Sequence, residues 1–518
     1  MNLEPYEKEL KKLNACIWDF AELKFQEFQS AQAMEDLLER HGFQVTRGLA
    51  HMPTAFVAEY GSGKPVIAIL GEYDALSGLS QEDGIWEEKP REGNPNGHGC
   101  GHCLLGTAAV GAGLLLKDYL AAHPGRGTVR VYGCPAEEGG SGKTYLTREG
   151  AFADVDAALT WHPGTQNEVM VGSNQANIQA AFTFRGRAAH AAAAPQNGRS
   201  ALDAVELMDV GVNYMREHMA DYDRVHYAIL DTGGVSPNVV QPKAEVLYLV
   251  RSRTNEETKR LYDRVVNIAR GAALMTETEL SVRFDKAVSN LVPNRTLGKV
   301  LHDAMVQVGA PLRTEAEKAF LKKFQDQLAP ERVWQDPGMA PFPDPELREE
   351  LIRKDPTGAY ILPYQPTNAV AMGSSDTGDV SYVTPLAQFA AACFAIGTSA
   401  HSWQWVAQDK GTVALKGCFF AARVLAEVSA MTAGLTEKDF AGVTAENAAT
   451  VGQKLYIQYG ITGVRGQVEA GLPAVLNVGL PVLEAGLAKG YDFDRVGGGA
   501  LLAILANSTD TNIIARSS

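Results

Sequence analysis

The chain has 518 residues, of which 45% are hydrophobic and 21% are charged, a balance typical of folded globular proteins rather than of disordered or fibrous ones. At about 150 residues per domain, this length predicts three or four domains. The formal net charge of -14 has the wrong sign for a protein that binds nucleic acid through its phosphates. We therefore expect no nucleic-acid partner.

Three further features bear on the compartment. The apolar runs, the longest at 108–116 and 500–506, are shorter than the roughly 18 to 20 residues that a membrane helix needs. The first 20 residues carry Glu4, Glu7 and Glu9 and do not resemble a signal peptide. Six cysteines in so long a chain are too sparse for a disulfide framework. We expect a cytoplasmic protein with no membrane span.

The first part of the chain alternates helices, strands and loops. Amphipathic patterns predict helices over 6–20 and 30–41, and strands over 56–60 and 66–70 are separated by a hairpin-like break. A helix over 104–120, a buried strand over 128–134 and a loop over 135–140 follow. This alternation predicts an α/β catalytic domain with a mostly parallel sheet, whose loops at the carboxyl ends of the strands carry the site.

The pattern changes after residue 173. Strand, helix, two strands, helix and strand follow one another, and this β-α-β-β-α-β order is that of a ferredoxin-like sandwich, expected here as an inserted lid domain. Beyond the insertion, α/β patterning returns up to a composition shift near 436–447. We accordingly expect four parts, a catalytic domain in two pieces, the lid and a short helical C-terminal tail: 1–173, 174–287, 288–435 and 436–518.

The residues that can ligate metal all lie in predicted loops at strand ends. They are Cys100 and His102 in Gly97-His98-Gly99-Cys100-Gly101-His102, Glu137 and Glu138 after a strand, His162, and His401. Thiolate, imidazole and carboxylate groups in this number fit a site for two divalent metals. Pro135 and Gly139-Gly140 place the two glutamates in a loop, so that one carboxylate can bind metal while the other acts as a general base. A single structural zinc on the Gly-rich loop is the alternative.

With this set of residues the chain resembles the dinuclear metal amidohydrolases of the aminoacylase and carboxypeptidase family, in the branch that contains the indole-acetyl amino acid hydrolases. The resemblance extends over about residues 10 to 425. It rests on eight ordered stretches: 71–81, 96–108, 132–143, 156–163, 184–195, 198–205, 236–241 and 400–404.

The resemblance implies a role for each candidate ligand. Cys100 would be the thiolate shared by both metals, with His102 and Glu138 on one metal and His162 and His401 on the other. Two more carboxylates receive roles, Glu137 as the general base and Asp74 as the group that orients a ligand.

Two positions depart from the wider pattern, and the metal is not decided. Glu72 stands where the wider family has a metal-binding histidine and is not expected to be a ligand. Cys103 stands where the branch more often has Asp or Asn. The metals implied are manganese or zinc, because thiolate favours zinc and carboxylates tolerate manganese.

The lid supplies the remaining candidates. His190, in Gly186-Arg187-Ala188-Ala189-His190, matches the histidine that reaches into a partner subunit's site and stabilises the oxyanion of the tetrahedral intermediate. Asn238 and Arg251 match lid residues that touch substrate, and a guanidinium can bind a carboxylate through two hydrogen bonds. Arg199 is a further candidate for the substrate carboxylate, or a surface arginine at a helix start.

The expected activity is hydrolysis of the amide of an N-acyl or N-aroyl amino acid, with p-aminobenzoyl-glutamate as the leading substrate. The alternatives are another N-acyl amino acid hydrolase or a dipeptidase, and a metal-containing binding subunit that has lost activity. We expect a homodimer through the lid, or a heteromer with a companion hydrolase subunit.

The end of the chain, 453–518, resembles the C-terminal piece of the triphosphoribosyl-dephospho-CoA synthase family. Only that piece matches, so we expect a helical appendage and no transferase activity. A functional role for this tail remains a third alternative.

Overall fold

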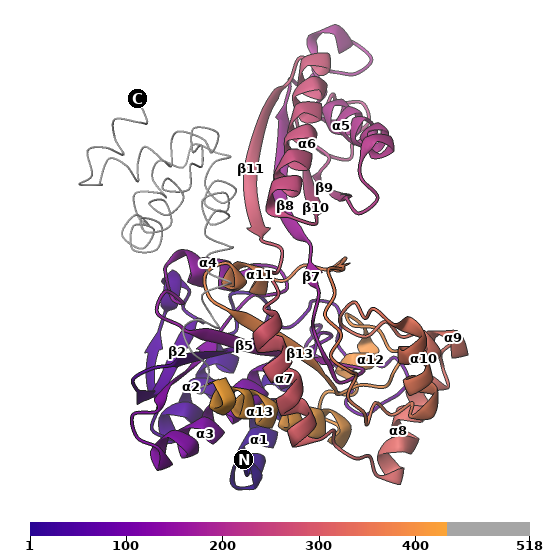
Figure 1. The fold of residues 1–518 in the computed structure, drawn as a ribbon. Helices are drawn as coiled ribbons and strands as arrows, with labels where there is room; N and C mark the ends of the chain where they lie inside the picture. The colour runs from indigo at the N-terminus through magenta and orange to yellow at the C-terminus, as the bar shows by residue number, and fades with distance from the viewer. Residues whose placement is uncertain (433–518) are drawn as a thin grey trace, which may run out of the picture. The chain divides into compact units, whose positions relative to one another are not determined.

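The computed structural model describes residues 1–432, and these residues form two compact units (Figure 1). The first unit comprises Met1–Ser173, Val292–Ala371 and the segment from Asp379 onward, and the second comprises Asn174–Leu291 and 372–378. The expected helical tail, 436–518, lies outside the described residues.

The first unit is built on a seven-stranded sheet with the order β1-β2-β4-β3-β5-β13-β6. The pairs β4/β3, β3/β5 and β5/β13 are parallel, whereas β1/β2, β2/β4 and β13/β6 are antiparallel. Its strands are β1 (Gln44–Arg47), β2 (Phe56–Ser62), β3 (Val66–Gly71), β4 (Gly127–Gly133), β5 (Ala157–Gly164), β6 (Glu168–Val169) and β13 (Leu386–Ala392).

Two expectations about this sheet need correction. The sheet is mixed rather than mostly parallel, because β1, β2 and β6 add antiparallel edges to a parallel centre. The predicted hairpin between β2 and β3 is wrong, since β4 lies between these strands and pairs with both. A strand from elsewhere in the chain can separate two neighbours that a short connection suggests would pair.

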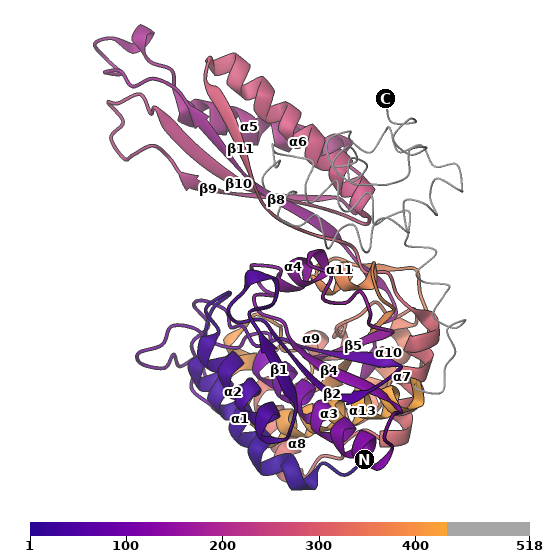
Figure 2. The ribbon, with the colours of Figure 1, turned by 90° about the vertical axis from the view of Figure 1, so that its left-hand side faces the viewer.

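Helices cover one face of this sheet in a continuous layer, in which α2 and α1 contact α3, α3 contacts α13, and α13 contacts α7 (Figure 2). These helices are α1 (Glu7–Phe20), α2 (Phe28–Arg40), α3 (His102–Ala122), α7 (Arg295–Val308) and α13 (Thr412–Thr432). The shorter helices are α4 (Gly142–Arg148), α8 (Glu315–Gln325), α9 (Pro330–Trp334), α10 (Pro345–Lys354), α11 (Thr377–Ser381) and α12 (Trp403–Val406). The remaining assignments are the 3-10 turns Glu4–Tyr6 and Leu49–His51 and two two-residue strands, β12 (Val370–Ala371) and β7 (Ser173–Asn174), the latter at the border with the second unit.

Helix α3 is the central helix of that layer. Its residues are rich in Ala and Leu and apolar on every side, the pattern of a helix buried all round. By length and composition α3 is the one described helix that could cross a membrane, but 83% of its most apolar stretch is buried inside the protein. The composition is therefore accounted for by its place in the core.

The second unit has a four-stranded antiparallel sheet with the order β11-β8-β10-β9. Helices α5 and α6 contact each other and both pack on β8 and β10 (Figure 1). Along β10 buried and half-buried residues alternate strictly, as expected where one face of a strand packs on helices. The elements in chain order are β8 (Ala176–Arg185), α5 (Ala201–Met215), β9 (Arg224–Asp231), β10 (Lys243–Ser252), α6 (Asn255–Thr276) and β11 (Glu279–Val288), with 3-10 turns at Pro195–Asn197 and Arg216–His218.

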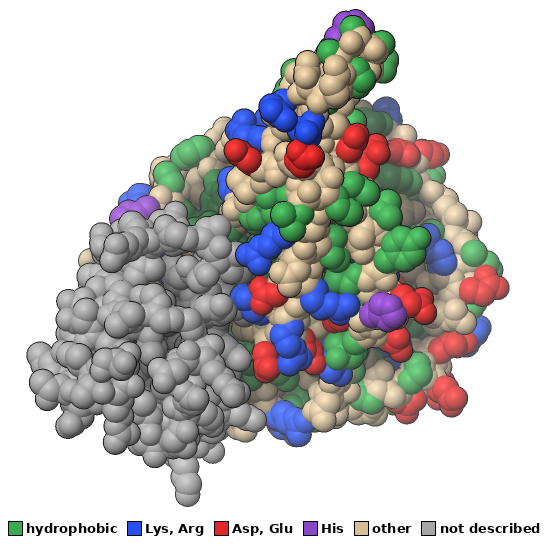
Figure 3. Space-filling view, turned by 90° about the horizontal axis from the view of Figure 1, so that it is seen from above, with side chains coloured by type: hydrophobic (Ala, Val, Ile, Leu, Met, Phe, Trp, Pro, Cys, Tyr) green, Lys and Arg blue, Asp and Glu red, His purple; other side chains and the backbone are tan. Residues whose placement is uncertain are grey.

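Figure 3 shows acidic and basic side chains intermixed on the described part of the face seen from above. A protein that binds nucleic acid usually presents a continuous basic surface instead. The absence of a nucleic-acid partner stays a prediction from net charge.

Candidate metal centre

The candidate ligands of the first unit gather at the carboxyl ends of its parallel strands, the usual place for a site in such a sheet. Glu137 and Glu138 follow β4, and Asp74 follows β3. His162 lies in β5 and His401 follows β13. Because β4, β3, β5 and β13 are neighbours in that order, residues far apart in sequence converge on one edge of the sheet.

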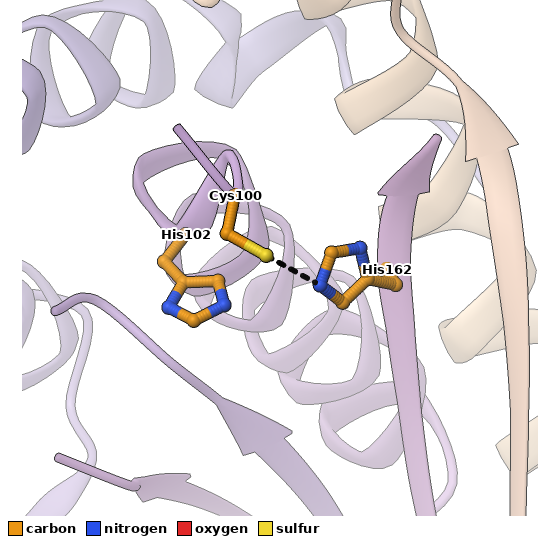
Figure 4. A group of neighbouring side chains, drawn as sticks. All are labelled: Cys100, His102 and His162. Atoms are coloured by element: carbon orange, nitrogen blue, oxygen red, sulfur yellow. Dashed lines mark hydrogen bonds between the residues drawn. The ribbon is translucent and has the colours of Figure 1, made fainter. Parts of the chain in front are cut away.

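The Gly-rich loop brings Cys100 and His102 to the same edge. Gly101 adopts a left-handed conformation, with φ 70°, immediately before α3 begins at His102. A Cβ atom at position 101 would lie 2.6 Å from Cγ of Pro163, so only glycine allows the loop to approach β5 this closely. Sγ of Cys100 then lies 3.4 Å from Nε2 of His162 (Figure 4).

Two groups of potential ligand atoms share the thiol of Cys100. In each group all the ligand atoms lie within 4.8 Å of one another. One group is Cys100, His102 and His162, and the other is Cys100, Glu138 and His401. The same five residues that the sequence singled out are thus brought together, with the cysteine common to both groups.

The distances group these ligand atoms differently from the division between two ions that the resemblance implied. His102 lies with His162 rather than with Glu138, and Nε2 of His401 lies 3.3 Å from Oε1 of Glu138. His401 has a left-handed φ of 58° and its N–H donates to the carbonyl of Gly99 at 2.7 Å, which ties its backbone to the loop that carries Cys100.

The donor set fits divalent ions. Among residues 1–432, Nε2 of His102 and Oε1 of Glu138 are buried side-chain atoms that form no hydrogen bond, although Glu72 and His401 lie at ion-pair distance from them. A buried polar atom without a partner is costly, and coordination to a metal would satisfy both atoms. Thiolate, imidazole and carboxylate are also the ligands that zinc and related ions take.

Asp74 orients two members of the set at once. Its Oδ1 lies 2.9 Å from Nδ1 of His102, and its Oδ2 accepts a hydrogen bond from the backbone N–H of Glu138 at 3.0 Å. A carboxylate that accepts from one imidazole nitrogen leaves the other nitrogen free to bind a metal. These contacts are those of an orienting group, the role that the resemblance implied for Asp74.

A third group contains Glu72, His102 and Glu137, whose ligand atoms also lie within 4.8 Å of one another. Oε2 of Glu72 lies 3.2 Å from Nε2 of His102, while Oε1 of Glu72 lies 2.6 Å from Nζ of Lys143. Both Glu72 and Lys143 are buried. Glu72 thus lies close enough to share an ion with His102, although a glutamate at this position was not expected to be a ligand.

Sequence reasoning missed Lys143. Lysine in the first turn of a short helix such as α4 normally lies in solvent, and the local pattern contains no signal that this one is buried. The only hint was its position at the end of the matching stretch 132–143.

Burial and the negative charge of Glu138 shift the pKa of Cys100 in the same direction, but burial and neighbouring charges act in opposite directions on the pKa values of His102 and Glu138. Burial and the charge of Glu138 raise the pKa of the Cys100 thiol well above its usual value. Burial disfavours the charged form of His102, but its contacts with Asp74 and Cys100 outweigh this effect and raise its pKa. Burial likewise opposes ionisation of Glu138, yet the contact with His401 and the charge of His102 lower its pKa to about 2. Without ions, the site thus favours a neutral thiol beside a positively charged His102, whereas burial lowers the pKa of His162.

In the second unit, His190 and Asn238 lie together. His190 pairs with Val239 in an isolated bridge, and the N–H of Ala191 donates to the carbonyl of Asn238 at 3.0 Å. Nδ1 of His190 accepts from the N–H groups of Ala192 and Ala193, at 3.2 and 3.1 Å. In the neutral ring the proton is then on Nε2, which makes Nε2 a hydrogen-bond donor.

Arg199 is already engaged within the second unit. Its Nε donates to Oε2 of Glu277 at 2.9 Å, and its Nη1 donates to the carbonyl of Gly198 at 2.6 Å. These contacts favour the surface interpretation of Arg199 over a contact with substrate.

Arg251 lies near the opposite end of β10. Lys243 and Arg251 pair with Arg185 and Asn177, respectively, on β8, and the eight residue steps from Lys243 to Arg251 span about 26 Å. Nη1 of Arg251 donates to Oγ of Ser374 at 2.9 Å. Within one chain, the lid candidates therefore divide into two groups at opposite ends of a strand.

The part of the chain that contains the candidate ligands is similar to known proteins. The family model described as Peptidase family M20/M25/M40 matches residues 68–402. One of the p-aminobenzoyl-glutamate hydrolase subunits of Escherichia coli (strain K12) is 48% identical over 413 residues, which cover 79% of this chain and 86% of that protein. The chain belongs to peptidase family M20/M25/M40. Membership in the M20/M25/M40 family makes it a hydrolase of amide bonds.

More distant relatives include the Xaa-Arg dipeptidase of Mus musculus, 31% identical over 301 residues that cover 56% of this chain and 65% of that protein. The crystal structure of an amidase of the hydantoinase/carbamoylase family from Burkholderia vietnamiensis aligns with a TM-score of 0.51 at 12% identity, covering 82% of this chain and 97% of that one. At this identity the structural likeness shows the fold alone, which is the α/β fold with a mixed sheet.

A second family model, described as ATP:dephospho-CoA triphosphoribosyl transferase, matches residues 375–518. This match begins well before the tail, because β13, α12 and α13 all lie within it. In the structure β13 pairs with β5 and α13 packs on α3. From Asp379 onward the described part of the match thus belongs to the first unit, and the predicted resemblance of the end of the chain to this family is confirmed.

Proposed function

We propose that the chain is a two-metal amidohydrolase that cleaves p-aminobenzoyl-glutamate into p-aminobenzoate and glutamate. The observation that carries the proposal is the thiol of Cys100, which is common to two groups of ligand atoms. The relative with 48% identity is named for p-aminobenzoyl-glutamate hydrolysis, and this supports the choice of substrate.

In this proposal Cys100, His102 and His162 hold one ion and Cys100, Glu138 and His401 hold the other, with manganese or zinc as the metal. Two divalent ions, when bound, supply polarisation of the amide carbonyl and a lowered pKa for the attacking water. Glu72 is an additional candidate ligand because one of its oxygens lies beside Nε2 of His102.

Glu137 is the proposed general base. Its carboxylate belongs to a group with ligand atoms of Glu72 and His102, so it can reach a water at the same edge of the sheet. Glu137 takes a proton from the attacking water and delivers it to the leaving amine nitrogen. General-base groups typically contribute about 10²- to 10⁴-fold to rate.

The lid completes the site in pairs of chains. His190, whose Nε2 is positioned as a donor, would stabilise the oxyanion, and Arg251 would bind the substrate carboxylate. Because these residues lie near opposite ends of β10, a substrate of this size cannot touch both in one chain. A homodimer in which each lid gives His190 and Asn238 to the partner's site satisfies this geometry.

Exposed hydrophobic side chains on the lid support such a dimer. Strand β9 forms an edge of its sheet, and Tyr227, Ile229 and Leu230 on it are 41 to 52% exposed. Exposed apolar edge strands are sites where another chain can add. The alternative partner is a companion hydrolase chain, and another of the p-aminobenzoyl-glutamate hydrolase subunits of Escherichia coli (strain K12) is 28% identical over 304 residues.

The test is a substrate panel on the metal-loaded full-length chain, containing p-aminobenzoyl-glutamate, other N-acyl amino acids and dipeptides. We expect release of p-aminobenzoate to have the highest kcat/KM, and Glu137→Gln to lower kcat by at least about 100-fold while retaining the ions. Preference for a dipeptide, as named for the mouse relative, would replace the substrate assignment. No turnover of any amide would contradict the proposed enzyme.

The shared site has a separate test. Glu137→Gln and His190→Ala chains are each expected to be inactive alone. When they are produced together, about half of the dimers are hybrids with one intact site, so activity should recover to about a quarter of wild type. No recovery would contradict donation of His190 between chains.

A further inference from the structure

A buried carboxylate outside the ligand set contacts the loop that carries the two active-site glutamates. Glu27 immediately precedes α2 and its side chain is 0% exposed. Its Oε1 accepts a hydrogen bond from the backbone N–H of Ala136 at 2.9 Å. Ala136 is the residue before Glu137, so this bond fixes the peptide that leads into the proposed general base.

The remaining capacity of the Glu27 carboxylate is used nearby. Oε1 also accepts from the N–H of Phe25 at 2.9 Å, and Oε2 accepts from Oγ1 of Thr54 at 3.1 Å. Tyr73 in turn donates its hydroxyl to the carbonyl of Thr54. Glu27 is therefore held from several sides, as a group must be if it is to hold something else in place.

The contacted residue has an unusual conformation. Ala136 has a left-handed φ of 60°, which is uncommon for a residue other than glycine and persists only where the surroundings enforce it. Its carbonyl accepts from the N–H groups of Gly140 and Ser141, at 2.8 and 2.7 Å. Both polar groups of the Ala136 backbone are thus engaged in shaping the turn around Glu137 and Glu138.

Asp74 secures the other side of the same turn, because its Oδ2 accepts from the N–H of Glu138 at 3.0 Å. The N–H groups before and after Glu137 are therefore each bound by a buried carboxylate, Glu27 on one side and Asp74 on the other. Two fixed points that flank one residue restrict its backbone and aim its side chain.

We propose that Glu27 is a positioning residue for catalysis, which fixes the left-handed turn at Ala136 and thereby aims Glu137 at the reacting atoms. The proposal rests on the proposed function for the role of Glu137. The property required of Glu27 is a hydrogen-bond acceptor rather than a charge, since every donor in contact with it is neutral.

This requirement separates two substitutions. Glu27→Gln keeps an oxygen that can accept from Ala136 and Phe25, and the hydroxyl of Thr54 can rotate to accept from the new amide. Glu27→Leu fills a similar volume and accepts nothing. Glu35→Leu is the matched control, because Glu35 is 3% exposed in α2 but contacts Arg47 and not the loop.

The experiment measures kcat and KM of the metal-loaded full-length variants on the best substrate of the wild-type chain. We expect Glu27→Leu to lower kcat by about 10- to 100-fold, the effect usual for such supporting contacts, with KM changed less than about threefold. Glu27→Gln should stay within about threefold of wild type, and Glu35→Leu should keep wild-type kcat per folded molecule. A folded Glu27→Leu chain with wild-type kcat, or equal losses in the Gln and Leu variants, would overturn the proposal.

A second measurement does not depend on activity. Hydrogen exchange of the peptide covering 133–142 in the metal-free protein should accelerate in Glu27→Leu and remain at the wild-type rate in Glu27→Gln and Glu35→Leu. If Glu27→Leu does not fold, Glu27→Asp takes its place, because the shorter side chain withdraws the acceptor from Ala136. An inactive wild-type chain would contradict the proposed function alone, whereas unchanged exchange would contradict the role of Glu27.

Discussion

The carboxylate of Asp74 lies 2.9 Å from Nδ1 of His102. This contact leaves Nε2 as the imidazole nitrogen that faces the ligand group. We expect Asp74→Asn to lower the affinity for divalent metal by about 10- to 100-fold, measured by competition with a chromogenic chelator. Asp118→Asn, at the other end of α3 beside Tyr6, should leave the affinity unchanged. Equal affinities in all three proteins would contradict the orienting role.

Removal of the shared thiol should affect both ions. Cys100→Ala takes one ligand from each group, so we expect metal analysis to find less than one ion retained per chain after dialysis. Cys418→Ala provides the control, since this buried thiol donates to the carbonyl of Leu104 and lies outside the ligand groups. Retention of a full second ion by Cys100→Ala would show that the cysteine belongs to one ion only.

The buried pair of Glu72 and Lys143 predicts strong coupling between two substitutions. Lys143→Met leaves the charge of Glu72 buried, which typically costs about 3–5 kcal/mol. The double variant Glu72→Gln with Lys143→Met should recover most of this loss in denaturant unfolding of the metal-free protein. Lys299→Met, which breaks the exposed pair with Asp303, should cost less than about 1 kcal/mol. Additive losses in the double variant would argue against the pairing.

Glu27 also predicts a dependence of stability on pH. Burial and the charge of Asp74 raise its pKa from 4.5 to about 7. A carboxyl with a raised pKa in the folded state stabilises most below pH 4.5, and this contribution is lost as the pH rises through about 7. Over this range the metal-free wild type should lose up to about 3 kcal/mol more stability than Glu27→Gln. Parallel curves for the two proteins would indicate an ordinary pKa in the fold.

The exposed edge strand of the lid predicts the oligomeric state. Ile229→Lys places a charge on β9, where the side chain is 44% exposed, and should convert a dimer to a monomer in light scattering after size exclusion. Leu312→Lys, at an exposed position of the first unit, should remain dimeric. A dimeric Ile229→Lys protein would move the interface elsewhere.

Local sequence patterns predicted the elements well but not how they pair. The helix expected at 6–20 is found at Glu7–Phe20, because one buried stripe at helical spacing is a local property. The insertion of β4 between β2 and β3 is not local, since it depends on hydrogen bonds to a strand about 60 residues away in the chain. Register and neighbours in a sheet therefore required the structure.

The ligands could be predicted from the sequence, whereas the buried groups that support them could not. The ligand residues stood out by residue type, in short motifs that carry a chemical mechanism. Glu27 and Lys143 did not stand out, because a charged residue in a helix or at its end is expected to face solvent until its burial is known. The left-handed backbone at His401, which ties this ligand to the loop of Cys100, is likewise displayed by no sequence pattern.

The position of His401 has a consequence for synthesis of the chain. This last candidate ligand follows β13, which lies between β5 and β6 in the sheet. Strand β13 and His401 both come after the whole lid in the chain. On the ribosome, where domains fold in order of emergence, the lid can fold while the centre of the first sheet still lacks a strand. Cys100, His102 and His162 are already outside by then, so a nascent chain can assemble one ligand group long before the other.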